Sequence, residues 1–316
     1  MIIKVKSPNV VLKTKDKYLT EDIKIEVDKS VINGEVNTLK NILDATKSAR
    51  YLFYGYEGES VDHLIGYNDT ENVENMSYIF GEADNITKLP EIITSKAKIM
   101  SFFANNCSKL ECIPFYDTPN VTNLEHAFYG CSCLIDVTNF SKWNTARVTN
   151  MSCLFGSSYP IGELKEINMP DMSKVSNPNG LFGNQIGLHT INNVNLISVQ
   201  RANNNEPFSN NKALTNLTIY NNKWNLQIGS GTTWGHLLTL ESLLHTCKEC
   251  IDTGSSATLT VGSANLEKLA NVYVKLTGEA EEDETLPKLP MVQCESTDEG
   301  AILVADYMLL KGWNLA

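Results

Sequence analysis

One motif recurs about every 25 residues through the middle of the sequence, and it constrains the possible folds more than any other feature. Its clearest copies begin at Thr70, Thr118 and Thr145, and each reads Thr-x-x-Val-x-Asn with a Phe five residues after the Asn. Degenerate copies lie between and after them, so that the Phe recurs at spacings of 23, 25, 27, 27 and 26 residues. These anchors are Phe80, Phe103, Phe128, Phe155, Phe182 and Phe208.

A second apolar element, Leu-x-x-Ile or a close variant, follows each Phe. The pairs are Leu89/Ile92, Leu110/Ile113, Leu134/Val137, Leu164/Ile167, Leu188/Ile191 and Leu214/Leu217. A period of 20 to 30 residues with one apolar element per period indicates leucine-rich repeats, because a single repeat cannot bury its own apolar face and stacked repeats can. The sequence therefore predicts an α/β fold, a leucine-rich-repeat solenoid with a parallel β-sheet.

The repeat also predicts local structure. We expect each Leu-x-x-Ile to form a short strand and each Asn-Met-x-x-x-Phe, as at 75–80, to form a helical turn whose Met and Phe share one face. Cys107 and Cys131 occupy matching places and are expected to be small core residues. The predicted repeat core is Met76, Phe80, Leu89, Phe103, Leu110, Phe128, Leu134, Met151, Phe155, Leu164, Phe182, Leu188, Phe208 and Leu214.

The pattern Asp-Thr-x-Asn-Val-x-Asn-Met-x-x-x-Phe resembles the BspA-like leucine-rich repeat of bacterial surface proteins, and the resemblance covers about half of the chain. It implies a binding or structural protein, because such a family is defined by its scaffold. The segment 12–25 is similar to N-terminal modules of phage tail and other virion proteins. The ending Lys311-Gly-Trp-Asn-Leu315 resembles the close of many phage and gut-bacterial repeat proteins.

The flanks divide the chain into further units. Residues 1–33 alternate apolar and polar side chains and predict a small N-terminal β module that attaches to something else. Residues 34–68 are expected to cap the solenoid, with a short helix over 36–48 and a strand at 52–54. The array itself is assigned to 69–222, and an α/β C-terminal cap to 223–316.

Within the C-terminal cap, strands are predicted at 225–228, 258–261 and 313–315, and a helical stripe runs from 237 to 251. A second helix is predicted from Ser263 to Leu276. A final helix is predicted to start near Ser296, where Thr297 and Asp298 offer capping side chains, and to end at Lys311-Gly312.

Composition and charge limit the classes of function that this chain can have. The net charge of -11 argues against nucleic-acid binding, which needs a basic surface. The sequence begins without a secretory apolar segment and has no run long enough for a membrane span, so we expect synthesis in a bacterial cytoplasm. The Cys residues lack the even spacing of a disulfide framework, and reduced thiols are expected.

No catalytic or metal site is predicted, and no cofactor. Cys247 and Cys250, with His245 nearby, supply too few converging ligands for zinc and are interpreted as thiols beside an apolar stripe. The segment 229–235 is glycine-rich but lacks the Lys of a phosphate loop. The acidic segment 279–284 is interpreted as a solvated loop. The remaining histidines, His63, His126, His189 and His236, are dispersed.

The candidate binding surface is the outward face of the predicted sheet. If Ile92, Val137 and Ile167 point inward, their sequence neighbours point outward. One row is Glu91, Asp136, Glu166, Thr190 and Asn216, and the next is Thr138, Asn168, Asn192 and Thr218. Repeat proteins commonly bind partners on this face, although a polar row of this kind also serves simply to keep a sheet soluble.

These observations favour a non-enzymatic phage virion component of a tail, baseplate or surface appendage, located in the virion. We expect its partners to be other virion proteins, further copies of itself in a symmetric oligomer such as a trimer, and a host-cell surface protein or glycan. The alternative is a bacterial cell-surface adhesin of the BspA-like type, and an enzyme carried on the repeat scaffold is a third, less favoured reading.

Overall fold

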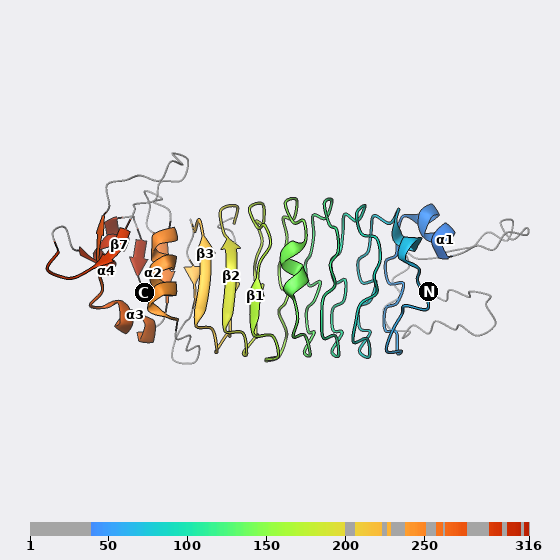
Figure 1. Cartoon of the computed structure of the whole chain (residues 1–316), viewed down its shortest axis with the longest axis horizontal. Helices are drawn as coiled ribbons and strands as arrows, with labels where there is room; N and C mark the ends of the chain where they lie inside the picture. The colour runs from blue at the N-terminus through green and yellow to red at the C-terminus, as the bar shows by residue number, and fades with distance from the viewer. Residues whose placement is uncertain are drawn as a thin grey trace, which may run out of the picture.

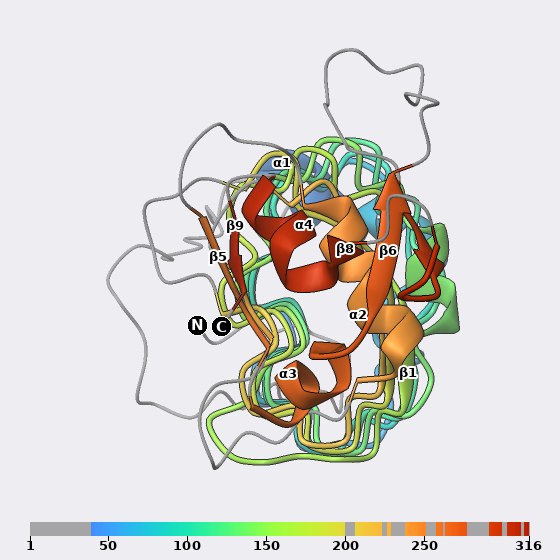
Figure 2. The same ribbon diagram turned by 90° about the vertical axis from the view of Figure 1, so that its left-hand side faces the viewer.

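The computed structural model describes residues 39–199, 206–222, 226–228, 238–250, 257–261, 263–276, 291–298, 302–310 and 313–315. They form an elongated stack, with helix α1 (Leu39–Thr46) at one end and the C-terminal helices and strands at the other (Figure 1). Viewed along the stack, successive turns of chain superimpose in one outline (Figure 2), and each turn is called a coil below. The fold is mixed α/β and contains a three-stranded parallel sheet. The predicted module at 1–33 and the segments 229–235 and 279–284 lie outside the described residues.

Backbone contacts between neighbouring coils set their register. One series of parallel bridges joins the Asn that ends each Val-x-Asn motif, or its equivalent, to its counterpart in the next coil. It runs through Ser48, Asn75, Ile99, Asn123, Asn150 and Asn177. Equivalent residues in neighbouring coils are therefore 24 or 27 positions apart, and this offset fixes which side chains stack on one another.

The segments predicted to be helical turns are not helical. In each coil a ribbon of turns follows the bridging residue, and every second N–H of this ribbon donates to the next coil instead of to a residue of its own coil. In one coil the donors Met76, Tyr78, Phe80 and Glu82 pair at 2.8–3.1 Å with the carbonyls of Ile99, Ser101, Phe103 and Asn105.

Positive φ angles explain why the ribbon cannot be a helix. The third residue after the bridge has φ of 57° at Tyr78, 55° at Phe102 and 53° at His126. A left-handed residue ends a right-handed helix and turns the next N–H outward. The 3.6-residue spacing of Met76 and Phe80 was therefore a misleading signal, although both side chains do point into the core.

Regular strands appear only in the later coils. They are β1 (Glu166–Asn168), β2 (Thr190–Asn195) and β3 (Asn216–Tyr220), which pair in parallel and in this order. The corresponding segments of earlier coils make isolated bridges. Pro90 and Pro114 directly follow inward residues there, and because proline has no N–H it cannot extend a strand ladder.

Two details of the predicted repeat register are wrong. The bridges from Lys88 to Cys112 and from Cys112 to Asp136 align Leu89 with Ile113, so the first apolar pair is Ile86/Leu89 and not Leu89/Ile92. The second wrong detail concerns Phe103, which was predicted to be equivalent to Phe80 and Phe128. The residue aligned with those two is Ala104. Because Phe103 comes one position early, its ring meets those of Phe80 and Phe128 at 84° and 72°, whereas the in-register pairs that follow are nearly parallel.

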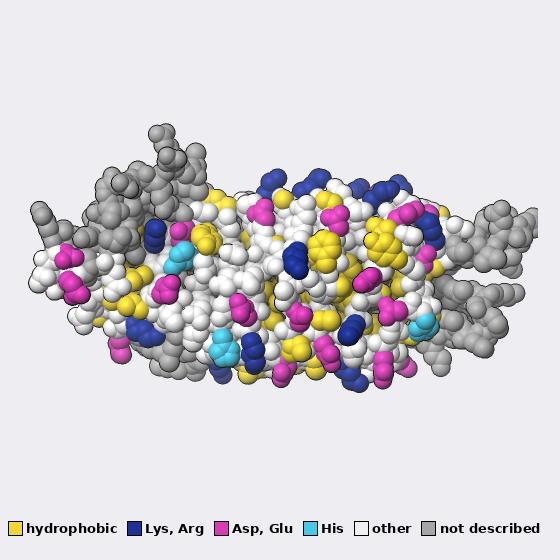
Figure 3. Space-filling view, in the orientation of Figure 1, with side chains coloured by type: hydrophobic (Ala, Val, Ile, Leu, Met, Phe, Trp, Pro, Cys, Tyr) yellow, Lys and Arg dark blue, Asp and Glu magenta, His cyan; other side chains and the backbone are white. Residues whose placement is uncertain are grey.

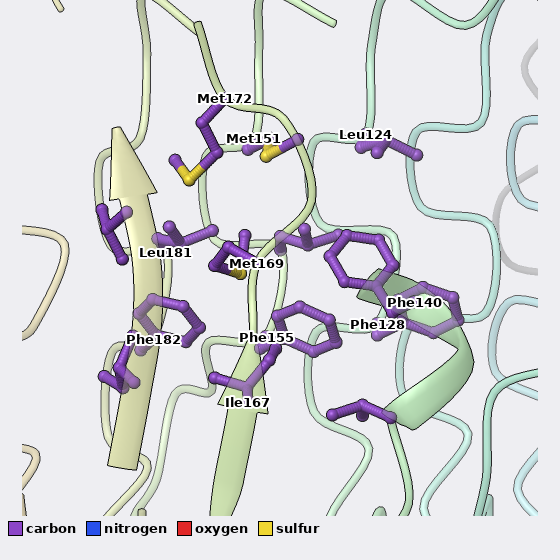
Figure 4. Packing of buried hydrophobic residues seen from close by; sticks show 14 of the residues in the cluster. Leu124, Phe128, Phe140, Met151, Phe155, Ile167, Met169, Met172, Leu181 and Phe182 are labelled. Atoms are coloured by element: carbon purple, nitrogen blue, oxygen red, sulfur yellow. The ribbon is translucent and has the colours of Figure 1, made fainter. Parts of the chain in front are cut away.

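The interior of the stack is a continuous apolar core. Every residue of the predicted repeat core is buried, with at most 6% of its surface exposed. The Phe rings stack coil on coil, at 5.8 Å between Phe128 and Phe155 and 6.2 Å between Phe155 and Phe182 (Figure 4). Met151 and Met172 fill the space above them.

The threonine that recurs in the motif has a direct structural role, because its copies form a row of buried hydroxyls. Each donates to a carbonyl of the next coil, as Thr70 does to Ile93 and Thr94 to Asp117, both at 2.7 Å. Thr118 and Thr145 repeat the contact with Asn144 and Asp171. The row therefore satisfies backbone groups that no strand pairs, at a bend in every coil.

The array starts earlier than predicted. Ser48 already bridges Asn75, and residues 51–55 form the first ribbon instead of the expected strand at 52–54. Phe53 stacks on Phe80 at 5.7 Å and joins the central row of rings. Helix α1 lies within the predicted range 36–48 and contributes Leu43 to the core. The short 3-10 helices η2 (Tyr67–Thr70) and η3 (Thr138–Lys142) lie where coils bend.

The C-terminal elements continue the stack and then leave it. They are β4 (Leu226–Gln227), α2 (Leu240–Glu249), β5 (Ala257–Thr260), α3 (Ser263–Leu269), β6 (Tyr273–Leu276), β7 (Met291–Cys294), β8 (Ile302–Leu303), α4 (Val304–Leu310) and β9 (Trp313–Leu315). β4, β5 and β9 form a parallel sheet, and β7, β6 and β8 an antiparallel one.

Two predicted helices in this region are wrong in extent. The predicted helix 263–276 ends at Leu269, and its second half is strand β6, because Val272 and Val274 alternate in burial with polar neighbours. The last helix starts at Val304 and not near Ser296, where the chain makes a turn. The strand at 313–315 and the helix within 237–251 agree with the prediction.

Helix α2 covers the open edge of β3. Its Ser242 hydroxyl accepts the Leu217 N–H at 3.0 Å, and His245 Nε2 lies 2.8 Å from the Ile219 carbonyl. The Thr239 N–H donates to Thr215 at 2.8 Å. Side chains of one helix thus pair backbone groups of an edge strand that would otherwise be left unsatisfied.

We expect Phe128→Ala and Phe155→Ala each to lower the free energy of unfolding by about 3–5 kcal/mol, because each removes a fully buried ring from the stack. Denaturant unfolding followed by circular dichroism measures this. Phe115→Ala is the matched control, since that ring is 54% exposed; it should change stability by less than about 0.5 kcal/mol. Equal effects at all three positions would contradict the packing described.

We expect Ser242→Ala to cost about 1–3 kcal/mol, because it leaves the N–H of buried Leu217 without its acceptor. Ser141→Ala provides the control, since that hydroxyl bonds a carbonyl at a more exposed site. The two variants are compared by the same unfolding measurement. A loss at Ser242 no larger than at Ser141 would show that α2 does not protect the edge of β3.

Candidate functional site

The strand register aligns most of the predicted binding face. Glu166 pairs with Thr190 and Thr190 with Asn216 across β1, β2 and β3, and all three have exposed or partly exposed side chains. These three residues are called the strand-face row below. In Figure 3 most of the surface over these three strands is neither charged nor hydrophobic, and acidic and hydrophobic side chains lie side by side on the coils closer to α1.

A second row beside it is hydrogen-bonded along its length. The Asn192 amide donates to Asn168 at 2.9 Å, and the Thr218 hydroxyl donates to Asn192 at 3.2 Å. These groups satisfy one another and so stabilise the sheet. In the strand-face row the Asn216 amide is also engaged, donating to Thr215 at 3.2 Å and accepting from Thr239 at 3.5 Å, which leaves Glu166 and Thr190 as the more available residues.

One predicted member of the first row, Glu91, is placed differently, and a second, Asp136, is engaged in a local turn. Lys88 and not Glu91 aligns with Cys112 and Asp136, because the first apolar pair lies three residues earlier than predicted. Asp136 aligns as expected with that coil, but its carboxylate accepts the Thr138 N–H at 2.9 Å at the start of η3. This backbone hydrogen bond lowers the pKa of Asp136. The Asp136 carboxylate and the Thr138 backbone are therefore bonded to each other in a local turn and stabilise that turn.

Exposed hydrophobic side chains also lie on the stack. Phe115 is 54% and Tyr67 59% exposed, and Ile135 precedes Asp136 with 57% exposed. Single exposed apolar residues are ordinary on a protein surface.

The ribbons carry a surface that the sequence did not predict, a ladder of four stacked rings. Tyr51, Tyr78, Phe102 and His126 occupy the same place in successive coils and are called the ring ladder. Neighbouring ring centroids are 4.7, 4.5 and 4.7 Å apart, with interplanar angles of 26°, 4° and 7°. All four side chains are partly exposed, unlike the buried Phe rows inside the stack.

The ring ladder is unusual because each of its residues has a positive φ, between 53° and 61°. The left-handed region costs a bulky residue about 1–2 kcal/mol, whereas a stacked ring pair gains about 0.5–1.5 kcal/mol. Four such residues cost about 4–8 kcal/mol and three ring contacts return about 1.5–4.5 kcal/mol, so stacking offsets only part of the backbone strain. In later coils Cys153 and Gly180 take the same place, so stacking is not needed for the backbone conformation itself.

The ends of the ring ladder differ in charge. At one end the Arg50 guanidinium lies 4.8 Å from the Tyr51 ring centroid and donates to the Tyr51 hydroxyl at 3.2 Å. At the other, Glu125 lies 3.8 Å from Nδ1 of His126. Burial lowers the pKa of His126, an effect that Glu125 opposes, so the ring is neutral at pH 7.

Four of the cysteines are buried inside the fold. Cys107 and Cys131 are buried and donate to the carbonyls of Phe80 and Ala104, and burial raises the pKa of both thiols. Cys247 in the last turn of α2 and Cys250 at its C-terminal cap are also buried. Among the residues that the structure describes, no three His, Cys, Asp or Glu side chains are grouped so that they could hold a metal ion.

Residues 41–112 and 97–224 match a protein family described as Mycoplasma protein of unknown function, DUF285. The two matches together span more than half of the chain. The chain belongs to this family. The DUF285 matches begin within α1 and end just beyond β3, so they coincide with the stacked coils and not with the C-terminal elements. No curated protein and no solved structure matches the chain.

Within the described ranges, none of the helices has the length and apolar character needed to cross a membrane.

We expect His126 to make stability pH-dependent. Its folded-state pKa lies below that of an unfolded histidine, about 6.5. The unfolded chain therefore binds the proton first as the pH falls, and the free energy of unfolding decreases from about pH 6.5 down through the folded-state pKa. His126→Phe, which keeps a ring in the ladder, should remove this decrease. His63→Phe, at an exposed histidine, should retain it. An unchanged pH profile in His126→Phe would contradict the assignment.

Proposed function

We propose that this DUF285 chain is a non-enzymatic structural and binding protein built as a leucine-rich-repeat solenoid of the BspA-like type. The register of the coils supports the repeat assignment, since equivalent residues recur every 24 or 27 positions from Ser48 to Asn177. The C-terminal helix α2 closes the edge of β3 in the way a capping element does.

The observation that carries the binding role is the strand-face row. Glu166, Thr190 and Asn216 repeat at one place on successive strands and face outward. Repetition gives a partner several equivalent contacts along one direction, so weak individual contacts add up across the coils. Exposed Phe115 and Ile135 add apolar contact area on coils closer to α1.

The setting we propose is a bacteriophage virion, in a tail, baseplate or surface appendage. Its support is the resemblance of residues 12–25 and 311–315 to segments of phage proteins. In this role the N-terminal segment attaches to the particle, and the strand-face row meets a neighbouring virion subunit or a host-cell surface protein or glycan.

A bacterial surface adhesin is the second candidate, and the BspA-like repeat itself favours it, because that repeat is typical of cell-surface proteins. The two settings require the same solenoid and the same exposed row. They differ in where the chain is found, so location distinguishes them.

Quantitative mass spectrometry of purified phage particles and of washed cell envelopes from the source culture tests the setting. The virion proposal predicts peptides of this chain in particles at a fixed ratio to known structural proteins. Peptides found in envelopes alone would contradict it and favour the adhesin.

The binding role is tested by Glu166→Ala combined with Thr190→Ala. We expect this variant to keep its thermal stability and to lose attachment to whichever fraction holds the wild-type chain. Glu163→Ala combined with Lys174→Ala is the control, because both side chains are exposed and lie outside the row. Attachment that survives the first pair would exclude the strand-face row as the contact surface.

A further inference from the structure

The ring ladder belongs to a surface whose side chains are arranged symmetrically about its own centre. The four coils that contribute the ladder also align a column of Arg50, Ser77, Ser101 and Glu125 immediately before it. Along the stack this column runs from a basic residue through two small residues to an acidic one. In the reverse direction it again has a charged residue at each end and small residues between, but the acidic residue comes first.

A column on the other side of the ladder has the same property. Tyr54 and Tyr129 lie at its two ends, and Gly81 and Asn105 lie between them. The outer tyrosines are partly exposed, and the inner pair is buried, so the surface is raised at both ends and lower in the middle. In a second copy turned by 180° about an axis through the middle of this column, Tyr54 faces Tyr129 of the partner, so the contact there is between aromatic rings at both ends.

The two charges at the ends have no opposite charge of their own. In the described part of the chain Arg50 forms no ion pair, and its guanidinium contacts the Tyr51 ring and hydroxyl. The Glu125 carboxylate contacts the Asn150 amide at 3.4 Å and His126 at 3.8 Å. These charges are three coils apart, which at a strand spacing of about 4.8 Å is too far for them to pair within one molecule.

We propose that this surface, the ring ladder with its two flanking columns, binds a second copy of the chain in an antiparallel, two-fold arrangement. The two-fold axis passes between the coils of Tyr78 and Phe102. Arg50 of each copy then faces Glu125 of the other, and no large side chain of this column stands near the axis, because Ser77 is buried and Ser101 is small. Such an interface is isologous, so one patch serves both partners and the assembly closes as a pair.

The composition of the surface agrees with this role. Aromatic residues are enriched and charges depleted at the centre of protein interfaces, with charged groups toward the edge. Here the partly exposed rings of Tyr78 and Phe102 lie at the centre of the patch, and Arg50 and Glu125 mark its two ends. Because stacking offsets only part of the left-handed backbone strain in the isolated chain, burial of the partly exposed rings against a partner adds stabilisation that the monomer lacks. This inference does not depend on what the strand-face row binds.

Charge reversal tests the arrangement. Sedimentation equilibrium of the full chain should show a reversible dimer. Arg50→Glu alone places two acidic pairs across the interface, and Glu125→Arg alone places two basic pairs. Each should raise the dimer dissociation constant at least about tenfold. The double variant restores opposite charges in the two-fold pair and should return the constant to the wild-type value.

Glu111→Arg is the matched control, since it makes the same charge change at an exposed residue next to the strand bridge at Cys112. It should leave the dissociation constant unchanged. Thermal unfolding of each variant separates misfolding from lost association. A monomeric wild-type chain, or a dimer that both single reversals leave intact, would overturn the proposal. A double variant that folds but stays monomeric would exclude the two-fold arrangement.

Discussion

The hydrogen bonds that run from each coil to the next are the interaction on which the rest of the structure depends. Along the ribbons every second N–H points in the same direction and ends on a carbonyl of the following coil. The motif threonines repeat this direction with their hydroxyls. Without its neighbours a coil would therefore have unpaired backbone groups, and its apolar side chains would be exposed to water. Stability then resides in contacts between neighbours, and an end must be covered, as α2 covers β3 through Ser242 and His245.

The same bonds make the ring ladder possible. Because ribbon N–H groups turn outward to the next coil, every fourth residue takes a positive φ, and its side chain is held at the surface at the spacing of the coils. Tyr51, Tyr78, Phe102 and His126 are thereby brought to 4.5–4.7 Å from one another, a distance at which rings stack. The ring ladder, on which our proposal of self-association depends, is thus a direct result of the hydrogen bonds between coils.

The period of the sequence was enough to predict the stacked apolar interior, since Phe128, Leu134 and Phe155 must be buried in any arrangement of that repeat. It was not enough for the register. Leu89 is followed at the same spacing by Ile92 and preceded by Ile86, and only the bridge at Lys88 decides between them. The ribbons were mistaken for helical turns because Met76 and Phe80 share a face in both. The ring ladder did leave a signal, an aromatic residue two positions after the Met of a repeat, but its meaning depends on a backbone conformation that Tyr and Phe rarely adopt.

Amide hydrogen exchange resolved to single residues tests the central claim most directly. If neighbouring coils hold each other through the ribbons, the amides of Phe102 and Ala104, which donate to Glu125 and Ala127 at 2.8 Å, should exchange only on unfolding of the array. The same slow rate should appear for Phe128 and Phe155 in the coils that follow. Exchange of these amides within the time expected for solvent-exposed turns would contradict the coil-to-coil bonding and the account built on it.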